Sequence, residues 1–286
     1  MRHTTLIQVA ELRALLATDA PVRLFDCSFD LMRPEAADTL FAEVHLPGAR
    51  QAHLDRDLSA KDPERAINGG RHPLPRPELF AAWLGAQGTR PDMQIVVYDR
   101  NGSSQAGRLW WMLKWIGHDA VAVLDGGLQA WEAAGGTVES GAAAAVEPTV
   151  FPLREPLARL VRTEDVMQAL GRPGQTVIDA RAAARHRGEV EPLDPVAGHI
   201  PGALNRPFTE NFGPDGRFKP AAQLRAEFDA LLAGREPGTV VHHCGSGVSA
   251  VPNVLAMEVA GMGRTGLYAG SWSEWCNTPG LPCAQG

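Results

Sequence analysis

Short apolar runs alternate with segments of helical apolar spacing along most of the chain. Continuous runs predict strands, and apolar residues that recur every three or four positions predict helices. In the first half this pattern predicts helices over residues 9–16, 79–84, 107–116 and 128–131, and strands over 22–25, 95–98 and 121–124. Because strands and helices alternate, we expect an α/β fold in which a mostly parallel sheet is flanked by helices.

The second half of the chain repeats the order of the first. Residues 177–179 (Val-Ile-Asp) match residues 24–26 (Leu-Phe-Asp), and the turn His-Ile-Pro-Gly-Ala at 199–203 matches His-Leu-Pro-Gly-Ala at 45–49. Self-similarity over this length indicates a duplicated domain, because a solenoid would have a much shorter repeat.

The segment between the two copies has no clear period. It is rich in glycine and alanine and ends near a proline, which is typical of a linker. We therefore predict an N-terminal domain over residues 1–136, a linker over 137–157 and a C-terminal domain over 158–286.

A cysteine lies between a strand and a helix of the second copy. Residues 239–241 predict a strand and a helix is expected to begin near Pro252, with Cys244 between them. Gly245 and Gly247 are expected to take up positive φ and to turn backbone N–H groups inward, and the helix N-terminus adds partial positive charge. Such surroundings favour the thiolate, which is the reactive form of cysteine.

Three other roles for Cys244 are open from the residues alone. Cys244 could be a small buried core residue. A phosphatase nucleophile after His243 would need an arginine at the far end of the loop to bind phosphate, and Ala250 stands there. A metal site made of His242, His243 and Cys244 is disfavoured, because adjacent strand residues point to opposite faces.

The first copy has no equivalent of this cysteine. Asp99 stands at the matching position, and no glycine-rich loop with a nucleophile follows it. The chemistry is therefore expected in the second copy, with the first copy as a wall of the cleft.

Composition narrows the class of protein. The 286 residues suffice for two domains, and 44% hydrophobic with 21% charged residues is typical of a soluble globular protein. A net charge of −6 without a basic run argues against nucleic-acid or anionic membrane partners. The N-terminus lacks an apolar signal region, and no stretch approaches the length of a membrane span. Four scattered cysteines (Cys27, Cys244, Cys276 and Cys283) predict no disulfide framework and a cytoplasmic location.

Four motifs together resemble the two-domain rhodanese-type sulfurtransferases, the family that holds thiosulfate and 3-mercaptopyruvate sulfurtransferases. The motifs are GHIPGALNRP, its echo HLPGA, LDGGLQAW and the loop CGSGVS, and the resemblance covers nearly the whole chain. It implies two tandem rhodanese-like domains and no metal or organic cofactor. In this family a CGSGVT loop marks the mercaptopyruvate branch, and Ser249 keeps the hydroxyl of that threonine.

The resemblance also implies a reaction. Cys244 would attack the sulfur of a small donor, hold it as a persulfide and pass it to cyanide, a small thiol or a thioredoxin-like protein. We expect 3-mercaptopyruvate as the donor, because Gly245 and Ser246 stand where thiosulfate enzymes typically carry basic residues. Thiosulfate:cyanide sulfurtransfer is the alternative, and a persulfide-relay protein that acts on a protein partner is another.

By the same resemblance, the loop residues Gly245, Gly247, Val248 and Ser249 surround the substrate. Ser246, His72 and Asp57 would form a relay that activates the attacking sulfur. Arg185 would bind the carboxylate of the donor. A second arginine of the mercaptopyruvate branch is replaced around Asp194, and Arg187 or Arg206 is expected to substitute for it.

Overall fold

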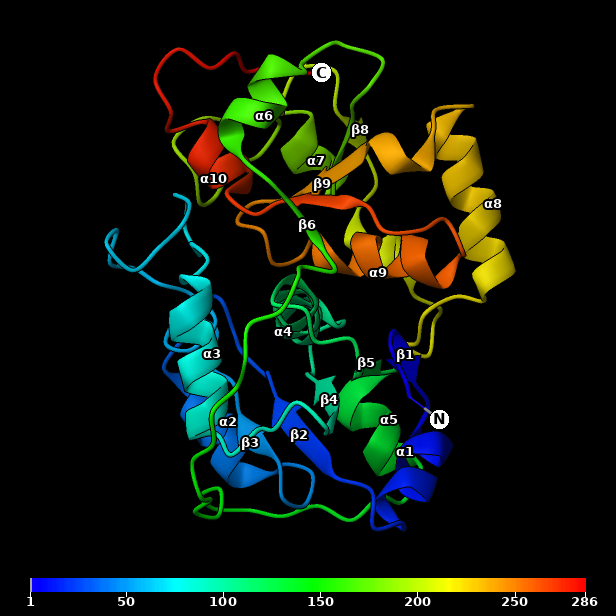
Figure 1. The fold of residues 1–286 in the computed structure, drawn as a ribbon. Coiled ribbons are helices and arrows are strands. Elements are labelled where there is room, and N and C mark those ends of the chain that lie inside the picture. Colours follow the sequence, from blue (N-terminus) through cyan, green and yellow to red (C-terminus); the bar gives the residue numbers. More distant parts are fainter. Residues whose placement is uncertain (1) are drawn as a thin grey trace. The chain divides into compact units, whose positions relative to one another are not determined.

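The computed structural model describes residues 2–286, which fold into two compact units (Figure 1). The first unit contains the chain up to Ala60 together with Pro75–Leu157 and Asp215–Arg217. The second unit contains Lys61–Leu74, Ala158–Pro214 and Phe218–Gly286. The loop Lys61–Leu74 therefore belongs to the second unit, although it lies in the first half of the sequence.

The first unit is built on a parallel five-stranded sheet with the strand order β1-β5-β4-β2-β3. Its strands are β1 (Leu6–Ile7), β2 (Val22–Asp26), β3 (Arg50–Gln51), β4 (Gln94–Tyr98) and β5 (Val121–Leu124). Its helices are α1 (Val9–Leu16), α2 (Ala36–Glu43), α3 (Pro77–Ala86), α4 (Ser104–Trp115) and α5 (Gly127–Ala133).

Helices cover both faces of this sheet. Alternate residues of the strands, such as Leu24 and Val96, form one core with residues of α1, α2 and α5. Phe25 points to the other face, where its ring lies 5.4 Å from that of Trp83 in α3, and α4 packs against β4 and β5 there. Two covered faces explain why β5 is apolar at all four positions and β4 at its three middle positions, without alternation of polar and apolar residues.

The second unit repeats this plan with the strand order β6-β10-β9-β7-β8, again all parallel. Its strands are β6 (Arg159–Val161), β7 (Thr176–Asp179), β8 (Leu204–Asn205), β9 (Val240–His243) and β10 (Gly266–Tyr268). Its helices are α6 (Thr163–Gln168), α7 (Ala183–His186), α8 (Ala221–Leu232), α9 (Val251–Val259) and α10 (Ser271–Trp275), with 3₁₀ turns η1 (Phe208–Asn211) and η2 (Pro237–Thr239).

The predicted α/β architecture and the internal repeat are confirmed. The predicted helix 9–16 and strand 121–124 have the observed bounds, and the other predicted elements are found within a few residues of their positions. The prediction omitted the helices α2, α6, α7 and α8 and the two- and three-residue edge strands. The edge strands are too short for a periodic signal. Within residues 2–286, no helix is both long and apolar enough to cross a membrane.

A buried histidine in the sheet of the second unit should make the stability of the folded protein depend on pH. His242 on β9 is fully buried, and neither ring nitrogen has a hydrogen-bond partner among residues 2–286. Burial lowers the pKa of His242 to about 3. The unfolded chain, with a histidine pKa of about 6.5, therefore binds the proton more readily. The folded state should lose stability as the pH falls from about 6.5 toward 3.

We expect His242→Leu to reduce this loss. Between pH 8 and pH 5 the free energy of unfolding should fall by about 2 kcal/mol more in the original protein than in the variant. Urea unfolding of both proteins at the two pH values measures the difference, since every other titrating group is shared. Parallel losses in the two proteins would contradict the prediction.

Candidate active site

Cys244 lies directly after the central strand β9 and before α9. Its residue is 1% exposed. The predicted place between a strand and a helix is therefore confirmed. Parallel strands present their carboxyl ends at one edge of a sheet, which is where ligands bind in open α/β folds.

The start of α10 holds the first two loop residues. The N–H groups of Trp272 and Ser273 donate to the carbonyl oxygens of Cys244 (3.0 Å) and Gly245 (2.9 Å), and the Cys244 N–H donates to Ser271 Oγ (3.1 Å). The backbone on which Cys244 sits is thus fixed by three hydrogen bonds from one short helix.

The two units differ in what fills this loop. In the first unit, Asp99 follows β4, and its carboxylate accepts backbone N–H groups at 2.9–3.0 Å from four residues, Asn101, Ser103, Gln105 and Ala106. In the second unit, Cys244 stands at that position, and within residues 2–286 the N–H groups of Ser246, Val248 and Ser249 donate to no protein acceptor. The second loop can therefore hold an anion that the protein itself does not supply.

The two glycines of the loop serve different purposes. Gly247 has φ +73°, as predicted, and a Cβ there would lie 2.2 Å from the carbonyl oxygen of Ala269. Gly245 does not take up positive φ, so that prediction was wrong. A Cβ on Gly245 would instead lie 3.2 Å from Arg71 Nη2 and 3.5 Å from Arg185 Nη1. Gly245 therefore provides room for two guanidinium groups beside the cysteine.

The structure brings His72 and Ser246 together. His72 Nδ1 lies 2.7 Å from Ser246 Oγ, and both residues are buried. This contact forms inside the second unit, because His72 is part of the loop Lys61–Leu74. A serine hydroxyl bonded to an imidazole can pass a proton to it or receive one from it.

Asp57 lies in the first unit, and its place in the relay stays a prediction. Its Oδ2 accepts the N–H of His53 at 2.8 Å, and Oδ1 lies 3.9 Å from Arg56 Nε. Burial raises the pKa of the Asp57 carboxyl.

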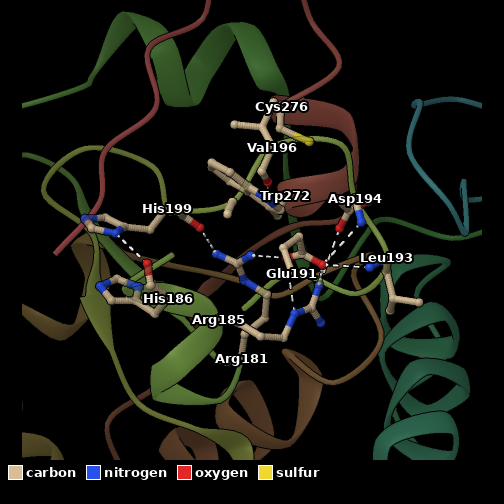
Figure 2. A network of polar contacts seen from close by, with 12 residues as sticks. Arg181, Arg185, His186, Glu191, Leu193, Asp194, Val196, His199, Trp272 and Cys276 are labelled. Carbon is tan, nitrogen blue, oxygen red and sulfur yellow. Dashed lines mark hydrogen bonds and ion pairs between the residues drawn. The ribbon is translucent and has the colours of Figure 1, made fainter. Parts of the chain in front are cut away.

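Arg185 is held by two carboxylates, as Figure 2 shows. Its Nη2 lies 2.6 Å from Glu191 Oε1 and 3.5 Å from Asp194 Oδ2. Burial would raise the pKa of Glu191, but hydrogen bonds from Arg185 and from the N–H groups of Leu193 and Asp194 lower it below its usual value. Glu191 is therefore an ionised counter-ion that fixes the Arg185 side chain.

Arg71 is a site residue that the sequence analysis missed. Its Nη1 and Nη2 donate to the two oxygens of Asp194 at 3.0 and 3.3 Å, and its N–H donates to Ser273 Oγ at 2.9 Å. The signal was present, because Arg71 directly precedes His72, which was already expected at the loop.

Neither expected substitute arginine is placed at the loop by its contacts. Arg187 is exposed and pairs with Glu189 at 2.7 Å. Arg206 is buried, pairs with Glu227 at 2.7 Å and lies over the ring of Phe228. Arg187 therefore resembles an ordinary surface arginine and Arg206 a structural one.

The sequence matches the rhodanese-like domain family over residues 8–134 and again over 162–278. The chain belongs to this family and carries two copies of its domain. A "Probable 3-mercaptopyruvate sulfurtransferase" of Pseudomonas aeruginosa is 45% identical over the full length of both chains. A "Putative thiosulfate sulfurtransferase SseB" of Mycobacterium tuberculosis is 38% identical over all of this chain and 98% of that one. The solved structure of the 3-mercaptopyruvate sulfurtransferase from Leishmania major has a TM-score of 0.83 at 29% identity, covering 97% of this chain and 76% of that one.

Gly247→Ala should destabilise the protein strongly, because it combines a left-handed backbone with a contact against Ala269. Gly261→Ala is the matched control, since Gly261 has φ +70° but nothing within 4 Å of an added Cβ. We expect the control to cost about 1–2 kcal/mol and Gly247→Ala a further 1–3 kcal/mol or so. Denaturant unfolding compares the two, and equal losses would show that the contact with Ala269 carries no cost.

Proposed function

We propose that this protein is a sulfurtransferase that moves sulfur from 3-mercaptopyruvate to a thiophilic acceptor through a persulfide on Cys244. One observation carries the proposal: Cys244 replaces the carboxylate that fills the loop of the first unit, and in the described part of the chain the N–H groups of Ser246, Val248 and Ser249 then have no protein acceptor. A relative named for this activity, which matches over the full length of both chains, supports the same donor.

In the first half-reaction, the Cys244 thiolate attacks the sulfur of the donor. The new S–S bond forms as the C–S bond breaks, and its electron pair passes to the carbon as the enolate of pyruvate. The enolate takes up one proton to become pyruvate. Ser246 and His72, 2.7 Å apart, are the groups in the second unit that can deliver that proton.

In the second half-reaction, an acceptor nucleophile attacks the outer sulfur of the persulfide. The S–S electron pair returns to Cys244 as thiolate, and cyanide, for example, leaves as thiocyanate. We propose a small thiol or a thioredoxin-like protein as the natural acceptor, and a reducing compartment such as the cytoplasm as the place of the reaction. The loop N–H groups would stabilise the persulfide anion between the two steps.

Thiosulfate is the second candidate donor. The loop has no basic side chain of its own, but Arg71 and Arg185 bring two guanidinium groups close to Gly245. A relative named for thiosulfate sulfurtransfer also covers the whole chain. Positive charge near the cysteine suits a dianion, although Glu191 and Asp194 neutralise it here.

Incubation with 3-mercaptopyruvate should add one sulfur atom to the protein, and this gain should be absent in Cys244→Ala. Intact-protein mass spectrometry before and after cyanide treatment measures the gain and its loss. Cys283→Ala is the control, because Cys283 is an exposed thiol outside the loop and should load normally. Loading of Cys244→Ala to the level of the original protein would rule out the mechanism.

Ser246→Ala should lower kcat with 3-mercaptopyruvate by about 100-fold or more, the usual contribution of general acid catalysis. With thiosulfate the loss should be small, because sulfite leaves without needing a proton. Steady-state kinetics with cyanide as the common acceptor compares the two donors. An equal loss with both donors would mean that Ser246 only shapes the loop.

A further inference from the structure

Two arginines converge on the residue that follows the cysteine. A Cβ at Gly245 would lie 3.2 Å from Arg71 Nη2, 3.5 Å from Arg185 Nη1 and 3.7 Å from Arg185 Nη2. The two guanidinium groups come from segments far apart in the sequence, and Asp194 accepts hydrogen bonds from both. The Asp194 side chain is buried at 3% exposure, whereas the side chains of Arg71 and Arg185 are 22% and 19% exposed.

Both arginines keep donors that the protein does not use. Within residues 2–286, Arg71 Nε is buried without a hydrogen-bond partner. Arg185 uses Nε and Nη2 for Glu191 and Asp194, and among the described residues its Nη1 donates no hydrogen bond. Unused donors beside a reactive group are free to bind an anionic ligand.

We propose that Arg71 binds the carboxylate of the sulfur donor together with Arg185, and that Asp194 positions the two guanidinium groups. This inference rests on the proposed function. In an extended 3-mercaptopyruvate the carboxylate carbon lies about 4 Å from the sulfur, given carbon–carbon bonds of about 1.5 Å. A donor whose sulfur meets Cys244 is therefore long enough for its carboxylate to reach the space around the next residue, Gly245.

The charges of this cluster bear on the choice of donor. Arg71 and Arg185 are balanced by Asp194 and Glu191, so the cluster has no surplus positive charge. A ligand with one carboxylate adds a single negative charge, whereas thiosulfate adds two. Asp194→Asn removes one negative charge and should raise kcat/KM for thiosulfate relative to 3-mercaptopyruvate. A purely structural Asp194 would lower both values together and leave their ratio unchanged.

The deciding experiment is a double-mutant cycle on Arg71 and Asp194. Arg71→Ala should raise KM for 3-mercaptopyruvate about 10- to 100-fold, the effect of a lost charge-assisted hydrogen bond, with a smaller change in kcat. The rise should persist when Arg71→Ala is combined with Asp194→Asn. If Arg71 only anchored its loop to Asp194, Arg71→Ala would not raise KM further in the Asp194→Asn variant. That result would overturn the inference.

Controls separate this inference from the proposed function. Arg225→Ala removes an exposed arginine of α8 that pairs with Asp229, and it should leave KM unchanged. Should Arg71→Ala fail to fold, Arg71→Lys keeps a charge and carries the test, with a smaller rise in KM expected. If the original protein loads sulfur but neither Arg71 variant changes KM, only the inference is overturned. No loading from 3-mercaptopyruvate at all would defeat the proposed function, and the inference with it.

Discussion

A carboxylate that is removed from water must be matched by cations, and Asp179 imposes this constraint on the second unit. It ends β7 with its side chain fully buried. Burial alone would raise the pKa of Asp179, but His243, His186 and Arg181 lower it below its usual range, so the group remains charged. Arg181 binds Asp179 at 2.7 Å and Glu191 at 3.3 Å. Removing either partner of the Asp179–Arg181 pair would leave a buried charge uncompensated, at a cost of about 3–5 kcal/mol.

The contacts of Arg181 extend toward the cysteine loop. Its guanidinium carbon lies 4.8 Å from the centre of the Trp272 ring, and the backbone N–H of Trp272 donates to the carbonyl oxygen of Cys244. Glu191, which also pairs with Arg181, fixes Arg185 (Figure 2). The buried Asp179–Arg181 pair thus supports both the backbone of Cys244, through Trp272, and the side chain of Arg185, through Glu191. Precise placement of reactive groups depends on such supporting contacts.

Much of the fold and part of the site could be predicted from local patterns. Apolar runs located the long strands, and the repeated His-x-Pro-Gly-Ala turn revealed the duplication. Asp26 and Asp179, which stand at matching positions of the two copies, both end strands and accept loop N–H groups, of Ser28 and Arg181. The prediction for Gly245 was wrong because a glycine can be needed for either of two reasons. It can adopt positive φ, or it can leave space where a side chain would clash, and the sequence alone does not say which reason applies. Arg71 and Asp194 could not be paired in advance, since 123 residues separate them.

The contact between Arg71 and Asp194 belongs to the loop Lys61–Leu74, which packs with the second unit. The sequence pattern of this loop does not indicate which of the two units it belongs to. Its attachment to the second unit has a consequence for how such a gene can change. The two copies are similar in plan, yet a fragment cut at the linker would leave His72 and Arg71 behind with the wrong half. Recombination at the linker between two relatives would therefore combine a second copy with a Lys61–Leu74 loop from another protein, and would separate His72 from the Ser246 that it contacts.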